Sequence, residues 1–186
     1  MCSIRPPRLR RRQRGFTLAE LMVIVVIVGV LAAIGISLLR NHVFASRSSE
    51  ALAMIQSIRA AEERWRAENQ TYLDVSRGQI DALYPMASPG KTRYHWVQSG
   101  GNDFDRWQLL NPTVSGPVQF GYAVVAGPPG ADNLPNLGLA DNPTWATPTE
   151  PWYVIKAVGD ADEDGVQAVF AASSFSSEVY RENEGE

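Results

Sequence analysis

The feature that most constrains this sequence is an apolar run of 24 residues, Phe16–Leu39, which contains one charged residue, Glu20. As an α-helix the run would be about 36 Å long, enough to cross a hydrocarbon core of about 30 Å. It is too long for the apolar part of a secretory signal peptide, and no small-x-small cleavage site follows it. The run therefore predicts one transmembrane helix.

Charge is distributed very unevenly around this run. The first fifteen residues contain six arginines and no acidic residue, and without those six the chain has 11 basic and 20 acidic residues, a net charge of −9. An arginine-rich amino end predicts that this end stays in the cytoplasm and that the body lies outside the membrane. A body of charge −9 argues against nucleic-acid binding, and the single cysteine, Cys2, excludes an intrachain disulfide.

Glu20 is the unusual residue of the apolar run. A carboxylate within lipid costs a few kcal/mol unless it is neutralised or lies near the headgroups. Cleavage after Gly15 would free an amine on Phe16, four residues before Glu20 and therefore one helical turn away. The new amine and the carboxylate could then pair, on the same chain or between neighbours.

Residues 14–21 (Arg-Gly-Phe-Thr-Leu-Ala-Glu-Leu), followed by the apolar run, resemble the class III signal of type IV prepilins and type II secretion pseudopilins. The resemblance covers residues 14 to about 68 and is only architectural beyond. It implies cleavage after Gly15 by a prepilin peptidase, N-methylation of Phe16, and a role for Glu20 in assembly. Ser37 stands where many of these families have a proline, and Ala19 where Ile or Val is common.

The helical pattern continues past the apolar run but becomes amphipathic. With no Pro or Gly between residues 36 and 68, we expect one helix from Phe16 to about Glu68, about 80 Å long. Its second half should lie on a sheet through four apolar residues: Leu52, Ile55, Ile58 and Trp65. Five charged residues should face outward: Arg47, Glu50, Arg59, Glu63 and Arg66.

The rest of the chain predicts a small antiparallel sheet of about four strands. Short apolar runs are separated by Gly, Pro, Asn and Asp. The candidate strands are Arg93–Gln98, Trp107–Leu110, Val118–Val125, Trp152–Val158 and Val166–Ala171. A short helical piece is expected at Gln79–Tyr84, and Ala126–Pro151 should be a surface contact loop or a mobile segment.

The predicted fold class is therefore α+β and pilin-like, with a long N-terminal helix packed on a small antiparallel sheet. The expected organisation is a cleaved basic leader (1–15), a transmembrane and assembly helix (16–39) and an extracytoplasmic head (40–186). The head consists of the helix over 40–68 followed by the sheet and its loops.

One acidic turn is a candidate metal site. Asp160, Asp162 and Asp164 alternate before Gly165, as in the first half of an EF-hand loop, and such hard oxygen ligands suit Ca²⁺. The closing acid is missing, because Ala171 occupies the twelfth position. A metal-free acidic turn between the last two strands is the alternative. Some related pilins and pseudopilins hold calcium in a carboxy-terminal loop, so the resemblance adds to the calcium interpretation.

No catalytic constellation is recognisable, and we expect no enzyme and no other cofactor. His42 and His95 have no metal-ligand spacing, and Trp145 in the long loop is a candidate contact residue.

The resemblance implies a structural subunit, a major or minor pilin, of a type IV pilus-like filament at the bacterial inner membrane. Its partners would be other pilin subunits, prepilin peptidase, the inner-membrane assembly platform and, before assembly, membrane lipid. A type II secretion pseudopilin is the alternative, although the DPWG-like motif common in major pseudopilins is not visible. A single-pass anchored periplasmic binding module is a further alternative.

Overall fold

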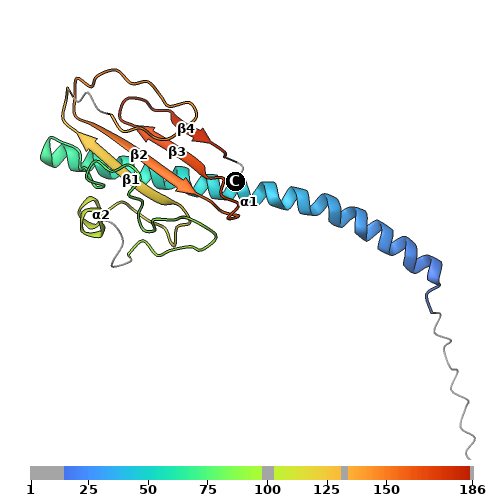
Figure 1. Ribbon diagram of the computed structural model, residues 1–186. Coiled ribbons are helices and arrows are strands. Elements are labelled where there is room, and N and C mark those ends of the chain that lie inside the picture. The colour runs from blue at the N-terminus through green and yellow to red at the C-terminus, as the bar shows by residue number, and fades with distance from the viewer. Residues whose placement is uncertain (1–14, 98–102, 131–133, 185–186) are drawn as a thin grey trace, which may run out of the picture. The chain divides into compact units, whose positions relative to one another are not determined.

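The long N-terminal helix and the small sheet are both present in the computed structural model, which describes residues 15–97, 103–130 and 134–184 (Figure 1). The arginine-rich leader up to residue 14 lies outside the described residues. The chain divides into two units, Met1–Arg40 and Asn41–Glu186. The first contains the apolar part of the helix, and the second, called the head below, contains the remainder of the helix and the whole sheet.

Helix α1 spans Leu18–Asn69, 52 residues, so the expected single helix is confirmed with small shifts at its ends. It ends at Asn69, whose side-chain amide donates to the Trp65 carbonyl, while Gln70 adopts a left-handed conformation (φ 63°). Such a residue after the last helical turn is a common helix stop, because it turns the backbone away from the helix axis.

The sheet has four antiparallel strands in the order β1-β2-β3-β4, each paired with its sequence neighbour (Figure 1). Their bounds are Gly121–Gly127 for β1, Trp152–Gly159 for β2, Ala168–Ser173 for β3 and Val179–Glu182 for β4. The strand number is as expected, but not every predicted run is a strand.

Trp107–Leu110 was wrongly predicted as a strand, because it forms the end of a short helix, α2 (Phe104–Leu110). Arg93–Gln98 contributes, within its described part, one isolated bridge between Tyr94 and Val118. Gln79–Tyr84 contains a turn at Ile80–Asp81 and ends in an isolated bridge between Tyr84 and Tyr122, so it is not a helical piece.

Both faces of the sheet are buried, which explains the nearly continuous apolar character of β2. On one face, Ile55 and Ile58 of α1 are fully buried in a cluster with Tyr122, Ile155 and Phe170. Leu52 and Trp65, also expected in this core, are partly buried against it.

The second face is covered by the long connection between β1 and β2. Leu137 and Leu139 of this connection are buried against Val125 and Val154. The described part of the connection therefore forms a layer of the head. The connection is long because it covers this face of the sheet with its apolar residues. Lys156 is the charged exception on β2; its Nζ lies 2.7 Å from Asp81 Oδ1.

Arg59 was expected to face solvent and does not. Its guanidinium donates to the carbonyls of Ser173, Ser176, Ser177 and Glu178 at 3.1–3.4 Å. A guanidinium offers five donors in a rigid fork, so one side chain can satisfy several carbonyls of the tight β3–β4 connection. Arg59 thus ties the middle of α1 to the carboxy-terminal hairpin.

Glu50 was also expected to face outward, yet its side chain is only 19% exposed. One carboxylate oxygen accepts the Gln119 amide at 2.7 Å, and the other lies 3.0 Å from Arg93 Nη1. Glu50 therefore connects α1 to the two segments that precede β1. Glu63, by contrast, is exposed as predicted.

Glu62 is a fully buried acid in the core-facing stripe of α1. Its Oε2 accepts the Leu73 amide at 2.9 Å, whereas its Oε1 is buried without a hydrogen-bond partner among the described residues. Burial raises the pKa of Glu62 to about 8, and the neighbouring carboxylates of Glu63 and Asp74 add to the increase. Glu62 is therefore mostly protonated in the folded head at neutral pH.

Candidate functional site

The N-terminal segment begins with two residues that are open to solvent. A side chain added at Gly15 would meet no atom within 4 Å, and Phe16 is 76% exposed. The backbone over residues 15–17 is not helical. An enzyme could therefore approach the Gly15–Phe16 peptide bond without displacing any described part of the chain.

Thr17 and Glu20 form a reciprocal cap at the start of α1. The Glu20 carboxylate accepts the Thr17 amide and the Thr17 hydroxyl, each at 3.2 Å. The Thr17 hydroxyl oxygen in turn accepts the Glu20 amide at 3.2 Å. This is a capping box, and its Thr-x-x-Glu spacing was readable from the sequence. In the uncut chain Glu20 therefore has a local structural role besides any role in assembly.

The apolar part of α1 is exposed over its whole described length. Leu18–Ile36 has a mean hydropathy of 2.8 and no buried residue. Soluble monomeric proteins rarely expose continuous apolar surface of this size, so lipid or other protein chains must cover it. Its length and composition suffice to cross a membrane.

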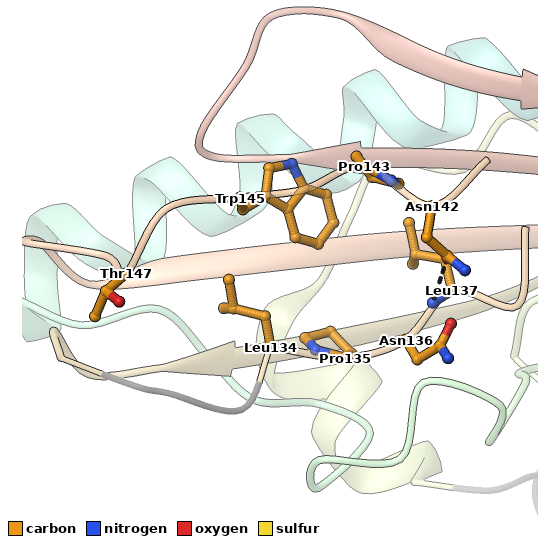
Figure 2. A pocket seen from close by; sticks show the side chains of 8 residues that line it. All are labelled: Leu134, Pro135, Asn136, Leu137, Asn142, Pro143, Trp145 and Thr147. Carbon is orange, nitrogen blue, oxygen red and sulfur yellow. Dashed lines mark hydrogen bonds between the residues drawn. The ribbon is translucent and has the colours of Figure 1, made fainter.

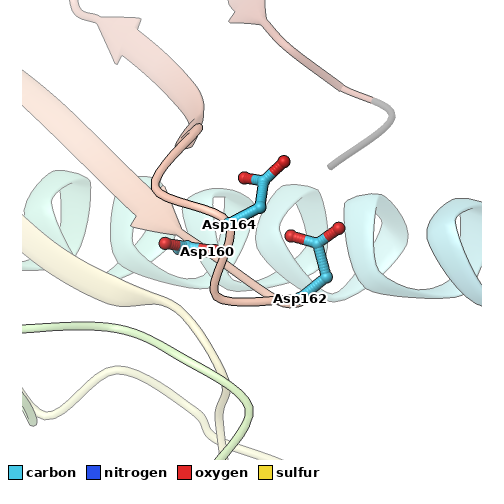
Figure 3. A group of neighbouring side chains, drawn as sticks. All are labelled: Asp160, Asp162 and Asp164. Atoms are coloured by element: carbon cyan, nitrogen blue, oxygen red, sulfur yellow. The ribbon is translucent and has the colours of Figure 1, made fainter.

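The acidic turn lies between β2 and β3, and Figure 3 shows the side chains of Asp160, Asp162 and Asp164 on it. One carboxylate oxygen from each of the three lies within 4.8 Å of the others. The structure thus brings the three predicted ligands together. Ala171 at the twelfth position is fully buried in β3 and supplies no ligand.

Backbone amides already use part of this carboxylate set. Asp160 accepts the amides of Glu163 and Gly165, and Asp164 accepts the amide of Val166. These bonds hold the turn in shape without an ion, as the alternative of a metal-free turn requires. Three convergent carboxylates can also hold a hard cation such as Ca²⁺, provided water or carbonyl oxygens complete the shell.

Glu163, the fourth acid of the turn, points to a different partner. Its carboxylate accepts the Lys91 amide at 3.1 Å and lies 3.4 Å from Lys91 Nζ. These contacts with Lys91 lower the pKa of Glu163 below its usual value. The contact ties the turn to the loop that precedes β1.

The long β1–β2 connection forms a pocket of about 310 Å³ between two of its own runs, 134–137 and 142–147 (Figure 2). Asn142 shapes it by accepting the amides of Leu137 and Leu139. Trp145, the predicted contact residue, lines the pocket and packs on Phe175 with ring centroids 5.4 Å apart. Trp145 is half-buried, so it contributes to the packing of the head as well as to its surface.

Neither histidine belongs to a cluster of potential metal ligands among the residues that the structure describes. His42 and His95 are both exposed. Among the residues that the structure describes, Asp160, Asp162 and Asp164 are the one cluster of potential metal ligands found. The geometry therefore provides an accessible Gly15–Phe16 peptide bond, an exposed apolar helix and a turn with three convergent carboxylates.

Comparisons with known proteins agree with the N-terminal geometry. The family model described as the prokaryotic N-terminal methylation motif matches residues 10–36. No solved structure matches the chain.

Curated relatives extend the similarity into the head. The type II secretion system core protein G of Pseudomonas aeruginosa is 30% identical over 145 residues, 72% of this chain and 99% of the relative. The protein of the same name from Escherichia coli K12 is 29% identical over 146 residues, covering 72% and 97%. The type IV major pilin protein PilA of Myxococcus xanthus is 38% identical over 73 residues, covering 39% and 33%. None of these comparisons indicates a catalytic function.

Proposed function

This chain is a pilin-like subunit of the family of type IV pilins and type II secretion pseudopilins, and we propose that it builds the pseudopilus of a type II secretion system. The observation that carries the proposal is the extent of the match. The similarity to protein G spans 99% of the Pseudomonas aeruginosa relative and 72% of this chain, whereas the match to PilA covers 33% of that pilin and 39% of this chain.

A type IV pilin is the second candidate. The match to PilA, at 38%, has the higher identity over the region it covers, and the DPWG-like motif common in major pseudopilins is not visible in this chain. Similarity over nearly the whole length of the relative weighs more than one short motif, because it extends beyond the N-terminal segment into the head. We therefore place the pseudopilin first.

The mechanism we propose uses three residues of the N-terminal segment. A prepilin peptidase cuts after Gly15 on the cytoplasmic side, and Phe16 becomes the methylated terminus. The Glu20 carboxylate then pairs with the Phe16 amine of a neighbouring subunit and fixes the axial register. Exchange of lipid for protein contact gives little hydrophobic gain, so packing and this charge pair steer assembly. The chain has no enzymatic role in this scheme.

The partners in this scheme are other pilin-like subunits and the inner-membrane assembly platform. Before assembly the chain is a single-pass protein of the inner membrane, with its amino end in the cytoplasm and its head outside. The six arginines of the leader support this orientation.

Processing gives the first test. Intact-mass measurement of the chain purified from membranes should show loss of residues 1–15 and gain of one methyl group. A Gly15→Val chain should keep its leader, because a branched side chain at the cut site hinders the peptidase. A membrane form of the parent chain with an intact leader would instead support an ordinary single-pass anchor.

Imaging then separates the two filament candidates. If the chain is a pseudopilin rather than a pilin, it should not be the bulk component of surface fibres on cells that express it at its natural level. Mass spectrometry of sheared surface material checks this. Recovery of the chain as the bulk component of surface fibres would favour the pilin.

Calcium binding by the acidic turn is a separate proposal, supported by the convergence of the three carboxylates. If Ca²⁺ binds only the folded head, calcium at 100 times its dissociation constant should stabilise it by about 2.7 kcal/mol. Thermal unfolding with calcium and with a chelator measures the shift.

The matched variants for this test are Asp162→Asn and Asp164→Asn, which should abolish most of the shift. Asp141→Asn, an exposed acid in the β1–β2 connection, should leave it unchanged. An equal calcium response in all four chains would rule out the turn as the site.

A further inference from the structure

The pocket within the β1–β2 connection is a feature of the head that the proposed function leaves unused. We call it the loop pocket. Its two runs, 134–137 and 142–147, are neither helical nor strands, and no backbone hydrogen bond joins them within the described part of the connection. The runs therefore leave an open space of about 310 Å³ between them (Figure 2).

The loop pocket lies on the face of the sheet that α1 does not cover. Three of its lining residues, Leu134, Leu137 and Trp145, pack in or against the apolar cluster on that face. The core-facing residues of α1 belong to the cluster on the opposite face. Assembly through α1, as proposed above, therefore makes no use of the loop pocket.

The lining combines one aromatic ring with uncharged polar groups. Among the described residues that line the pocket none is charged, and Trp145 supplies the aromatic ring. Trp145 packs on Phe175 with ring centroids 5.4 Å apart, which holds the indole in place. Figure 2 shows the indole on one side of the pocket and Leu134 and Pro135 on the other. A ligand in the pocket would therefore lie between a fixed aromatic ring and an apolar wall.

Asn136 and Thr147 offer hydrogen-bonding groups that the described part of the head leaves unused. Asn136 Oδ1 accepts the Gly138 amide at 2.9 Å, which leaves its Nδ2 amide without a partner among the described residues. The Thr147 hydroxyl likewise has no partner there, and both side chains are exposed. The two residues lie at opposite ends of the pocket (Figure 2). A ligand can thus accept from Asn136 and either donate to or accept from Thr147.

The charge around the loop pocket favours an uncharged ligand. Residues 41–186 contain 10 basic and 19 acidic residues, and Asp141, next to the lining residue Asn142, is exposed. Such surroundings repel an anion. A cation, in turn, would find no carboxylate among the described residues that line the pocket. The lining therefore suits a neutral molecule that carries both apolar CH groups and several hydrogen-bonding groups.

We infer that the loop pocket binds an uncharged sugar unit of a glycan. A sugar ring presents CH groups on its faces and hydroxyl groups at its edge, so it can pack on the Trp145 indole while its hydroxyls reach Asn136 and Thr147. Pro135 and Pro143 restrict the backbone of the two runs, so little conformational freedom is lost on binding.

A proline-rich peptide is the other neutral ligand to consider. Grooves for such peptides are lined by several aromatic side chains, whereas among the described lining residues the loop pocket has Trp145 alone. Free polar groups at both ends of the pocket also match a sugar, whose hydroxyls surround the ring, better than a peptide rich in proline, which has few donors. Because the loop pocket lies wholly within the head, the inference does not depend on which filament the chain builds.

Indole NMR signals make a site-specific test possible, because the chain has five tryptophans and Trp145 alone lines the pocket. The full chain, labelled with ¹⁵N-tryptophan, is dissolved in a polyoxyethylene detergent, which has no sugar headgroup. A Trp145→Phe chain identifies the Trp145 signal by its loss. The probes are cellotriose and tri-N-acetylchitotriose, two uncharged trisaccharides. The Trp145 signal should move saturably with at least one of them, and the four other signals should move less.

Two variants then test the polar ends of the pocket. Thr147→Val keeps the shape of the side chain and removes the hydroxyl, and Asn136→Ala removes the amide donor. Each should raise the dissociation constant of the sugar about fivefold, as expected for the loss of one neutral hydrogen bond. Thr144→Val is the matched control, since it makes the same change at an exposed position of the same run that does not line the pocket. Sugar-free spectra that match the parent spectrum show that the variant heads are folded.

Several results would overturn the inference. They are a Trp145 signal that neither trisaccharide moves, equal shifts of all five indole signals, and equal affinities in the Thr147→Val and Thr144→Val chains. Hexaproline added in place of the sugars provides the comparison with a peptide. A saturable Trp145 shift with hexaproline and none with either sugar would assign the loop pocket to a proline-rich partner.

Discussion

A chain with Glu20 replaced by alanine should enter the membrane and lose its leader as the parent does, yet be absent from filaments. The reason is that removal of one carboxylate leaves the apolar run intact but leaves the Phe16 amine of the neighbour without its partner. Incorporation should fall at least tenfold, because an unpaired charge within an apolar bundle costs several kcal/mol. Mass spectrometry of isolated filaments, compared with the membrane fraction, measures the ratio.

The capping box makes this prediction sharper, because Glu20 also caps α1 in the uncut chain. Glu20→Gln keeps the hydrogen-bonding shape of the cap and removes the charge, whereas Thr17→Ala removes the cap hydroxyl and keeps the charge. If charge pairing drives assembly, the glutamine chain fails and the Thr17→Ala chain assembles. The opposite order would assign Glu20 to capping alone and would remove the ion pair from the mechanism.

Replacing Glu62 with glutamine should stabilise the head, and the gain should grow with pH. The folded pKa of about 8 lies above the ordinary value of 4.5, so the folded chain holds a proton that the unfolded chain releases. Between pH 4.5 and 8, the free energy of unfolding of the parent should therefore fall by about 1.4 kcal/mol per pH unit. Glutamine carries no such proton, so its advantage should be near zero at pH 4.5 and up to about 3 kcal/mol at pH 7.

Denaturant unfolding of the full chain in neutral detergent measures this difference at several pH values. The five tryptophans all lie in the head and report its unfolding by fluorescence. Glu68→Gln is the matched control, since it makes the same chemical change at an exposed site of the same helix. A parent-to-Glu62→Gln difference that stays constant with pH would show that Glu62 is ionised in the folded head.

The N-terminal half of the molecule was predictable because two strong patterns coincide there. The apolar run is followed by amphipathic spacing without Pro or Gly, and together these patterns predict one long helix. The observed ends of α1 differ from the expected ones by one or two residues. The segment from Gly15 to Glu20 was found from its residues. Its capping box was missed, although the Thr-x-x-Glu spacing was visible.

The errors in the head come from short segments. Trp107 and Leu110 are apolar residues three apart, a spacing that fits a helix turn as well as part of a strand, and a run of four residues cannot decide between them. Strand β4, Val179–Glu182, was missed because it is short and includes two charged residues. An edge strand needs one partner rather than a buried face, so tertiary pairing defines it more than its composition does.

Buried charges were the other source of error. Glu62 lies four residues after Ile58 and seven after Ile55, so helical periodicity already placed it in the core-facing stripe. Charge alone suggested a solvent position for Arg59 and Glu50, which instead meet partners from distant loops. For the acidic turn, the three carboxylates singled out from the sequence lie within 4.8 Å of one another, and cation binding there stays a prediction.

The hydrogen bonds between Arg59 and the β3–β4 connection also bear on the order in which parts of the head can fold. Their acceptors are 114 to 119 residues further along the chain. In the orientation proposed above, the second half of α1 would cross the membrane before the residues that carry these carbonyls, and its apolar stripe would have no sheet to cover it until they followed. Closure of the head is thus a late, long-range step. Until the sheet packs on it, the core-facing side of α1 would remain an exposed apolar surface that favours association with other chains.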